Sequence, residues 1–172
     1  SVSISASLQE IVILRPEGDI FNDIRPMARI YASVVLEENG KRETGSSGSG
    51  GRHSLSTLMQ ESKWKSHVCE AIRIAGVNLT AEPAPAGEMD IVLGPGWPGV
   101  MLHEAVGHGL EADFNRKKTS AFSELLGKKV ASKDVNIIDD GTIPNRRGSI
   151  SIDDEGTKSN CNILIENGIL VN

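Results

Sequence analysis

The spacing of two histidines constrains this chain more than any other feature. His103 and His108 flank Glu104 in the run His103-Glu104-Ala105-Val106-Gly107-His108. On a regular α-helix of about 3.6 residues per turn, side chains five positions apart diverge by about 140°. The two imidazoles can therefore face the same side only if the backbone absorbs one extra residue, as a π-bulge does. We predict such a distortion with Gly107 inside it, because glycine has no side chain to crowd a widened turn.

Two imidazoles and a carboxylate at this spacing suit a divalent metal ion. Neutral imidazoles bind zinc and leave a coordination position for water, whose pKa the metal lowers. We predict His103 and His108 as metal ligands and Glu104 as the catalytic general base of a hydrolase. A histidine pair on a partly buried helix is commonly structural, so the spacing alone leaves both interpretations open.

The residues around the motif predict an α+β fold. Met89 to Leu93 is typical of a short buried strand, and the run from Gly94 to Gly99 predicts a sharp turn that places Pro98 near the first turn of the motif helix. Alternating apolar residues predict further strands that pair in a mixed or antiparallel sheet with packed helices. These strands are expected at Arg29 to Glu37, Val135 to Ile138, Ser149 to Ile152 and Ile163 to Glu166, with a hairpin turn at Asn39-Gly40 and a short helix at Ala121 to Ala131. The apolar period between Glu61 and Leu79 predicts a helix with Trp64 as a core anchor.

The motif and its flanks resemble the PmbA/TldD metallopeptidase family, in particular its TldD branch. The similarity includes later segments as well as the motif, and it covers essentially the whole chain. The segments that carry it are Val92 to Gly99, His103 to Glu111, Asp113 to Arg116, Arg147 to Ser149, Asp153 to Thr157, Leu164 to Leu170, and the glycine-rich stretch Gly45 to Arg52.

This resemblance implies a zinc-dependent peptidase. It assigns metal binding to His103 and His108 and catalysis to Glu104, with unfolded peptides as substrates. It also implies a heterodimer with a TldE/PmbA-type partner subunit that lacks the motif. The family's third metal ligand is a cysteine near the C-terminus of a chain more than twice as long, and no segment here matches it.

Other residues of the chain are weaker candidates for a third ligand. Glu111 lies three positions after His108, so it can face the metal or hydrogen-bond a ligand histidine, although a solvated surface carboxylate is also consistent with the pattern. Asp113 is a similar but weaker candidate. Cys161 is predicted at a strand start and Cys69 within a helix, and unpaired cysteines usually behave as small buried hydrophobic residues.

Strand patterns at both ends of the chain predict a fragment of a longer protein. The alternating run at Val2 to Leu8 starts at once, and only Ile169 to Asn172 follows the turn signal Asn167-Gly168. We divide the chain into residues 1–82, part of an N-terminal α+β region, a stiff proline-containing linker at 83–88, and residues 89–172, the start of the metal-site region.

Composition narrows the class of partner. The chain carries 18 basic and 23 acidic residues and a net charge of -5, which disfavours nucleic acid as a partner. No apolar run is near the length of about 18 residues that predicts a membrane helix. Two distant cysteines without a secretory leader favour a reducing compartment, so we expect a cytoplasmic protein without membrane association.

Two polar segments leave alternatives open. The stretch Gly45 to Arg52 lacks the Gly-Lys-Ser/Thr ending of a phosphate loop, so it predicts a flexible loop or a glycine-rich edge strand that can pair with an extended peptide. The pair Arg146-Arg147 is able to bind a substrate carboxylate, although a solvated loop is the simpler interpretation.

These observations predict a zinc-dependent peptidase of the HExxxH type, inactive as this fragment alone. The alternative is a catalytically inactive module for peptide binding or subunit assembly, because two histidines alone hold zinc weakly. Peptidases of the dipeptidyl-peptidase III kind share the hexapeptide, but the residues that flank it here follow the TldD pattern.

Overall fold

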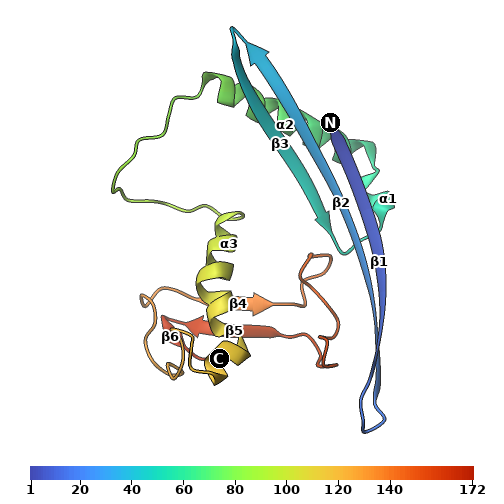
Figure 1. Cartoon of the computed structure of the whole chain (residues 1–172), viewed down its shortest axis with the longest axis vertical. Helices are drawn as coiled ribbons and strands as arrows, with labels where there is room; N and C mark the ends of the chain where they lie inside the picture. The colour runs from blue at the N-terminus through green and yellow to red at the C-terminus, as the bar shows by residue number, and fades with distance from the viewer. The chain divides into compact units, whose positions relative to one another are not determined.

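The computed structural model describes all 172 residues, and their contacts form two compact units (Figure 1). Unit 1 contains Ser1–Ala84 and Asp140–Asn160, and unit 2 contains Pro85–Asp139 and Cys161–Asn172. Both combine helices with sheets, which confirms the α+β prediction. The division into residues 1–82, 83–88 and 89–172 stays a prediction. No helix has the length and apolar character needed to cross a bilayer.

Three antiparallel strands form the sheet of unit 1, in the order β1 (Val2–Leu14), β2 (Ile20–Glu38) and β3 (Lys41–Gly51). Asn39 and Gly40 connect β2 to β3 with φ values of 51° and 80°. Positive φ at both central residues suits a two-residue hairpin, as the Asn-Gly pair predicts. The glycine-rich stretch lies mostly in β3, so the edge-strand alternative is confirmed.

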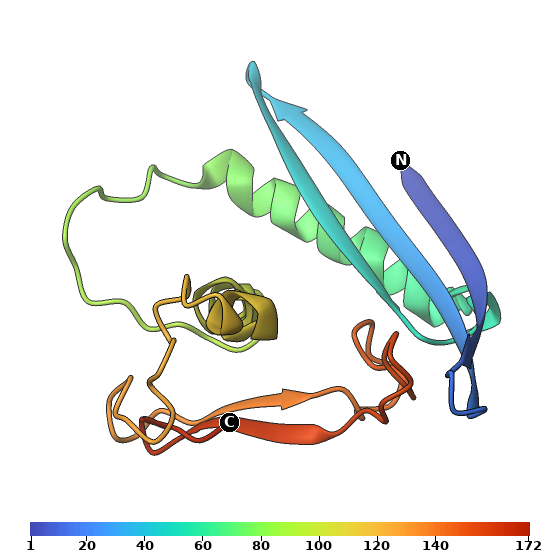
Figure 2. The same ribbon diagram turned by 60° about the horizontal axis from the view of Figure 1, so that its bottom comes forward.

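The helix α2 (Glu61–Thr80) packs on β2 and β3, after the short helix α1 (Leu55–Leu58) (Figure 2). Small side chains make this contact close, since Ala71 and Ala75 are fully buried and a Cβ atom at Gly45 would overlap the backbone of both. At the end of α2, the Lys41 ammonium donates hydrogen bonds to the carbonyls of Asn78 and Leu79 at 3.0 and 2.7 Å. That contact satisfies carbonyls that the helix leaves unpaired.

Two side chains predicted for the core of α2 are exposed instead. Trp64 retains 36% of its surface, and Cys69 is also exposed. Strand β3 packs directly against the small side chains of Ala71 and Ala75. Larger apolar residues with the same period lie beside this contact and stay partly exposed. Ala71 and Ala75 follow the predicted apolar period and are buried, so the period located the helix, but Trp64 has the same period and is exposed.

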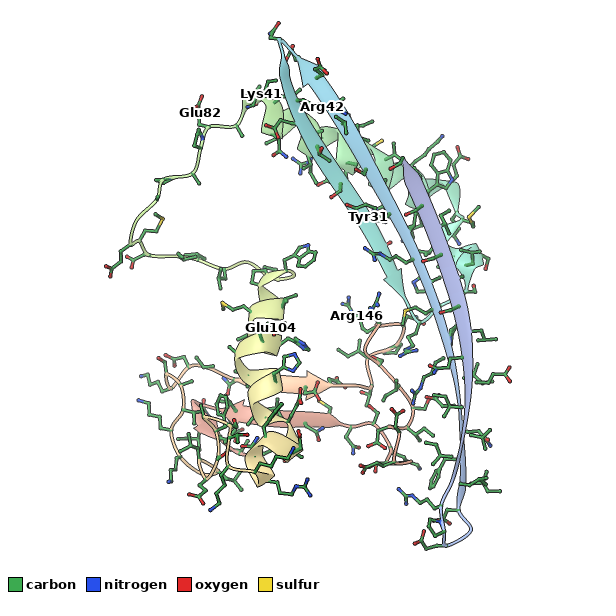
Figure 3. All side chains as sticks on the ribbon, viewed as in Figure 1. Tyr31, Lys41, Arg42, Glu82, Glu104 and Arg146 are labelled. Carbon is green, nitrogen blue, oxygen red and sulfur yellow. The ribbon has the colours of Figure 1, made fainter.

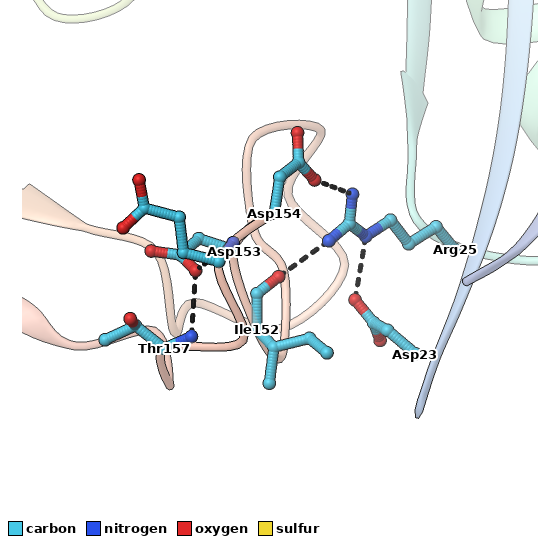
Figure 4. Close-up of polar contacts among 7 residues, drawn as sticks. Asp23, Arg25, Ile152, Asp153, Asp154 and Thr157 are labelled. Atoms are coloured by element: carbon cyan, nitrogen blue, oxygen red, sulfur yellow. Dashed lines mark hydrogen bonds and ion pairs between the residues drawn. The ribbon is translucent and has the colours of Figure 1, made fainter. Parts of the chain in front are cut away.

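Segment Asp140–Asn160 joins the sheet of unit 1 through Arg25 on β2 (Figure 4). Its guanidinium donates to Asp23 Oδ2 at 2.8 Å, to the Ile152 carbonyl at 2.6 Å and to Asp154 Oδ1 at 3.4 Å. Burial alone would raise the pKa of Asp23, but hydrogen bonds from Arg25 and Ser151 outweigh it and lower that pKa. The pair therefore stays ionised while it holds β2 and the segment together.

Unit 2 begins with an exposed segment and continues into the motif helix, which consists of α3 (Pro98–Leu102), a π-helical turn η1 (His103–Gly107) and a 3-10 turn η2 (His108–Leu110). The short helix α4 (Ala112–Arg116) follows. Strands β4 (Ile137–Asp140), β5 (Cys161–Glu166) and β6 (Ile169–Leu170) form the second sheet. Val106 of the motif helix shares a small core with Ile165 and Leu170.

Three predictions of local structure were wrong. Residues 89–93 form no strand and are exposed, with Val92 97% accessible, because no strand pairs with this apolar run. Residues 121–131 form turns rather than a helix, and the chain around Lys128 to Val130 instead bonds to β6. The strand predicted at Ser149 to Ile152 is reduced to one bridge between Ile152 and Lys158.

The contact at Gly45 makes a specific stability prediction. We expect Gly45→Ala to destabilise unit 1 by about 1–3 kcal/mol, because the added methyl group forces α2 away from β3. The matched control is Gly76→Ala in α2, where an added Cβ meets no atom within 4 Å and the gain in helix propensity is about 0.5–1 kcal/mol. Urea unfolding measures both, and equal stability of the two variants would contradict the packing.

Candidate metal centre

The motif helix accommodates the five-residue spacing by a local change in its hydrogen bonding. The backbone N–H of His108 donates to the carbonyl of His103, five residues earlier, in the π-helical turn His103–Gly107. The predicted distortion is therefore confirmed, and Gly107 lies within it. Apart from the backbone of the helix itself, a Cβ atom at Gly107 would contact only His103 Nδ1, at 3.8 Å, so no packed neighbour requires glycine there.

This turn brings the two imidazole rings together. Their centroids lie 4.5 Å apart and their planes meet at 74°. The Glu104 carboxylate lies between them, with Oε1 at 4.0 Å from His103 Nε2 and Oε2 at 3.7 Å from His108 Nε2. All three side chains are half or more exposed. Figure 3 shows Glu104 projecting from the motif helix.

Glu111 fixes the orientation of one of these rings. Its Oε1 lies 2.5 Å from His108 Nδ1, and this hydrogen bond is the main cause of a raised pKa at His108, with the charge of Glu104 adding to it. When Nδ1 of the neutral ring carries the proton shared with Glu111, Nε2 carries the free lone pair that can bind a metal. Of the two alternatives for Glu111, the geometry matches the contact with a histidine rather than a solvated carboxylate.

Polar side chains hold the C-terminal end of the motif helix. Asn115 Nδ2 donates to the carbonyls of Gly109 and Glu111 at 2.9 and 3.0 Å, and the Ser120 hydroxyl donates to Gly109 at 2.5 Å. These contacts satisfy carbonyls that a short helix leaves unpaired. The Phe122 ring packs on Gly109, where an added Cβ would approach it to 2.6 Å. His108 and Glu111 therefore lie on a braced turn.

A cavity of about 730 Å³ adjoins the motif helix. Both motif histidines and Glu111 line it, as do Leu102, Val106 and Leu110 on one side and the segment from Asn136 to Asp139 on the other. The apolar pattern predicted a strand near Val135 to Ile138 but gave no reason to place it beside the motif. That placement depends on the pairing of β4 with β5, which no local pattern encodes.

The remaining candidate ligands lie elsewhere. Among His, Cys, Asp and Glu side chains, the cluster able to hold one ion contains His103, Glu104 and His108, whereas Cys161 is exposed at the start of β5. Asp113 forms an ion pair with Lys117 at 3.3 Å. In unit 1, His67 bridges the hydroxyls of Ser47 and Ser49 and belongs to no cluster of three such side chains.

The three clustered side chains fit a divalent metal by their chemistry and spacing. Their ligand atoms all lie within 4.8 Å of one another. Two nitrogens bound to one zinc ion at about 2.0–2.1 Å each are at most about 4.2 Å apart. Small rotations of these exposed side chains bring the ligand atoms from within 4.8 Å to the separation that one zinc ion requires.

Comparisons with known proteins give the class of the chain. Residues 86–172 match the family profile described as "PmbA/TldA metallopeptidase C-terminal domain", and residues 1–79 match "PmbA/TldA metallopeptidase central domain". The chain belongs to the PmbA/TldD metallopeptidase family.

Individual relatives agree with this membership. The chain is 53% identical to the "Metalloprotease TldD homolog" of Haemophilus influenzae over 99% of its own length and 36% of the relative's. A "Zinc metalloprotease TldD homolog" of Saccharolobus solfataricus is 35% identical over 54% of this chain and 20% of that protein. The chain thus spans about a third of the length of the first relative.

A solved structure supports the fold. The crystal structure of TldE from Thermococcus kodakarensis superposes with a TM-score of 0.79 at 20% identity, covering 99% of this chain and 37% of that one. At this level of identity the likeness concerns the fold alone.

The contact between Glu111 and His108 predicts a pH effect in the metal-free chain. We expect His108 to titrate above its ordinary value of 6.5, because the neighbouring carboxylates favour the imidazolium, and Glu111→Gln should lower that pKa. The ring protons of His108, followed by NMR against pH, measure both values. The control Glu124→Gln removes an exposed carboxylate that pairs with Lys118. A pKa of His108 that is the same in all three proteins would remove Glu111 from this role.

Proposed function

We propose that unit 2 holds one zinc ion through His103 and His108, and that the protein hydrolyses peptides with Glu104 as general base. The observation that carries this proposal is the π-helical turn, which places two imidazoles and a carboxylate within 4.8 Å in a member of a metallopeptidase family. A relative whose name includes zinc supports the choice of metal.

A zinc ion bound there supplies Lewis acidity, which lowers the pKa of water and polarises a carbonyl group. The chain's own residues perform the remaining work. Glu104 accepts a proton from the attacking water on a carboxylate oxygen and later donates it to the leaving amine. Glu111 holds His108 at Nδ1, so that Nε2 keeps its lone pair directed away from Glu111.

The cavity beside the motif supports an extended peptide as substrate. Apolar side chains from the motif helix form part of its wall, and the segment from Asn136 to Asp139 supplies polar groups opposite. A volume of about 730 Å³ exceeds the needs of a single side chain, so several residues of an unfolded peptide fit. A folded protein domain does not.

Two further parts of this proposal come from the family. A cysteine outside the matched segments provides the third ligand, so the 172 residues by themselves bind metal but turn over little peptide. The active assembly pairs this subunit with a TldE-type partner, which the similarity to TldE supports at the level of fold. We place the protein in the cytoplasm.

A second candidate is a catalytically inactive module that binds peptides or a partner subunit. The observation in its favour is the exposure of the three motif side chains, which gives a metal little protection from water. The two functions differ in zinc affinity. A catalytic centre binds one zinc ion tightly, whereas a scaffold with two incidental imidazoles binds it only at millimolar concentration.

Zinc binding and turnover of an unstructured fluorogenic peptide test the proposal together. Competition with a chromophoric chelator measures zinc affinity, and peptide cleavage measures turnover. Both are measured in a longer chain that adds the segment with the family's cysteine, assayed with its partner subunit. We expect Glu104→Gln to keep zinc and to lose about 10²–10⁴-fold in kcat, the range typical of a general base.

His108→Ala should lose the metal itself, because one imidazole cannot hold the ion alone. The matched control is His67→Ala, which removes a histidine hydrogen-bonded to two serines in unit 1. Unchanged zinc content in His108→Ala would refute the ligand assignment. Full activity of Glu104→Gln would refute the catalytic one.

A further inference from the structure

Unit 1 contains a cavity of its own, of about 460 Å³. The stretch of β2 from Asp23 to Pro26 forms one wall, and the loop from Gly141 to Asn145 forms another. Arg52, which directly follows β3, and Ser149 also line the cavity. We call this space the Arg52 pocket.

The charges that line the Arg52 pocket do not balance. Its charged lining residues are Asp23, Arg25 and Arg52. Arg25 is fully engaged, since it pairs with Asp23 and also donates to the Ile152 carbonyl. Arg52 forms no ion pair with any carboxylate of the chain. Arg25 also contacts the Asp154 carboxylate at 3.4 Å, so Arg52 is the charged residue of the lining that has no ion-pair partner.

Hydrogen bonding is incomplete at the same place. The Nε atom of Arg52 and the hydroxyl of Ser149 are buried and have no hydrogen-bond partner within the chain. Buried donors are nearly always satisfied in folded proteins, and a charged one is the most costly to leave unpaired. The charged Arg52 Nε–H group and the neutral Ser149 hydroxyl line the same cavity, and the chain supplies no acceptor for either. A ligand with acceptor atoms can satisfy both groups there.

The backbone fixes the position of Arg52. Its N–H donates to the Asn145 carbonyl at 3.1 Å, and Gly51 lies so close to that carbonyl that a Cβ atom would overlap it. The arginine is therefore anchored at the wall rather than carried on a free loop. Arg146 and Arg147 follow Asn145 and are exposed, and neither forms an ion pair. Figure 3 labels Arg146 on this loop. Both residues add positive potential near the loop.

We propose that the Arg52 pocket binds a carboxylate, either a small free acid or the carboxylate of a peptide. A carboxylate carries one negative charge, which matches the single guanidinium of the lining that has no ion-pair partner. Its two oxygens can accept from an arginine and a serine hydroxyl together. A phosphate dianion would bring a second charge that the lining does not balance. This inference is independent of the metal centre, because it uses residues of unit 1 alone.

Side-chain NMR of arginine Nε–H groups provides a direct test in the unmodified chain. The probes are sodium acetate for a free acid, N-acetylglycine for a peptide terminus and N-acetylglycinamide as the uncharged counterpart. We expect a saturable shift of the Arg52 Nε–H resonance with a carboxylate probe. N-acetylglycinamide should bind at least about tenfold more weakly than N-acetylglycine, because the charge-assisted hydrogen bond is lost. Tighter binding of N-acetylglycine than of acetate would identify a peptide terminus as the source.

Variants check the assignment. Arg52→Gln should abolish the saturable response, followed through the backbone amide of Ser149, and Arg52→Lys should weaken it while keeping the charge. The matched control is Arg42→Gln, which removes an exposed, unpaired arginine from strand β3, the strand that Arg52 follows, and should leave binding unchanged. A linear response that sodium chloride reproduces, or equal affinity in Arg52→Gln, would overturn the proposal. Dispersed backbone spectra establish that each variant folds, and titration of the unmodified chain tests carboxylate binding without any variant.

Discussion

One backbone hydrogen bond, from the N–H of His108 to the carbonyl of His103, brings the two motif histidines to the same side of the helix. A regular helix would direct the two imidazoles about 140° apart and leave no shared site. The π-helical turn removes that difference and puts their ring centroids 4.5 Å apart with Glu104 between them. The cavity and the hydrogen bond from Glu111 adjoin this turn, in a chain that belongs to a metallopeptidase family.

A π-helical turn is rare because its hydrogen-bonding geometry is less favourable, so its surroundings must stabilise it. In unit 2, Val106 anchors the turn in the core formed with Ile165 and Leu170. Beyond the turn, Asn115 and Ser120 satisfy the exposed carbonyl of Gly109. The anchoring residue and the caps are separate from the three motif side chains, which stay exposed to solvent.

Local rules predicted the features that depend on local backbone geometry. The five-residue spacing required the π-bulge, and Asn39-Gly40 and Asn167-Gly168 marked hairpins because both positions of such a turn need positive φ. Predictions that depended on a distant partner were less successful. Residues 89–93 have strand composition but no pairing strand, and Trp64 follows the apolar period although the small residues of α2 make the contact. The Arg52 pocket likewise joins segments that lie far apart in sequence, and no motif marks it.

The central claim is that both imidazoles bind a single ion. Zinc K-edge X-ray absorption on the chain loaded with one equivalent of zinc counts imidazole ligands through their characteristic multiple scattering. We predict two histidine nitrogens at about 2.0–2.1 Å from each zinc ion. A spectrum with one imidazole or none per zinc ion would contradict this claim, because the π-helical turn would then bring the rings together without creating a metal site.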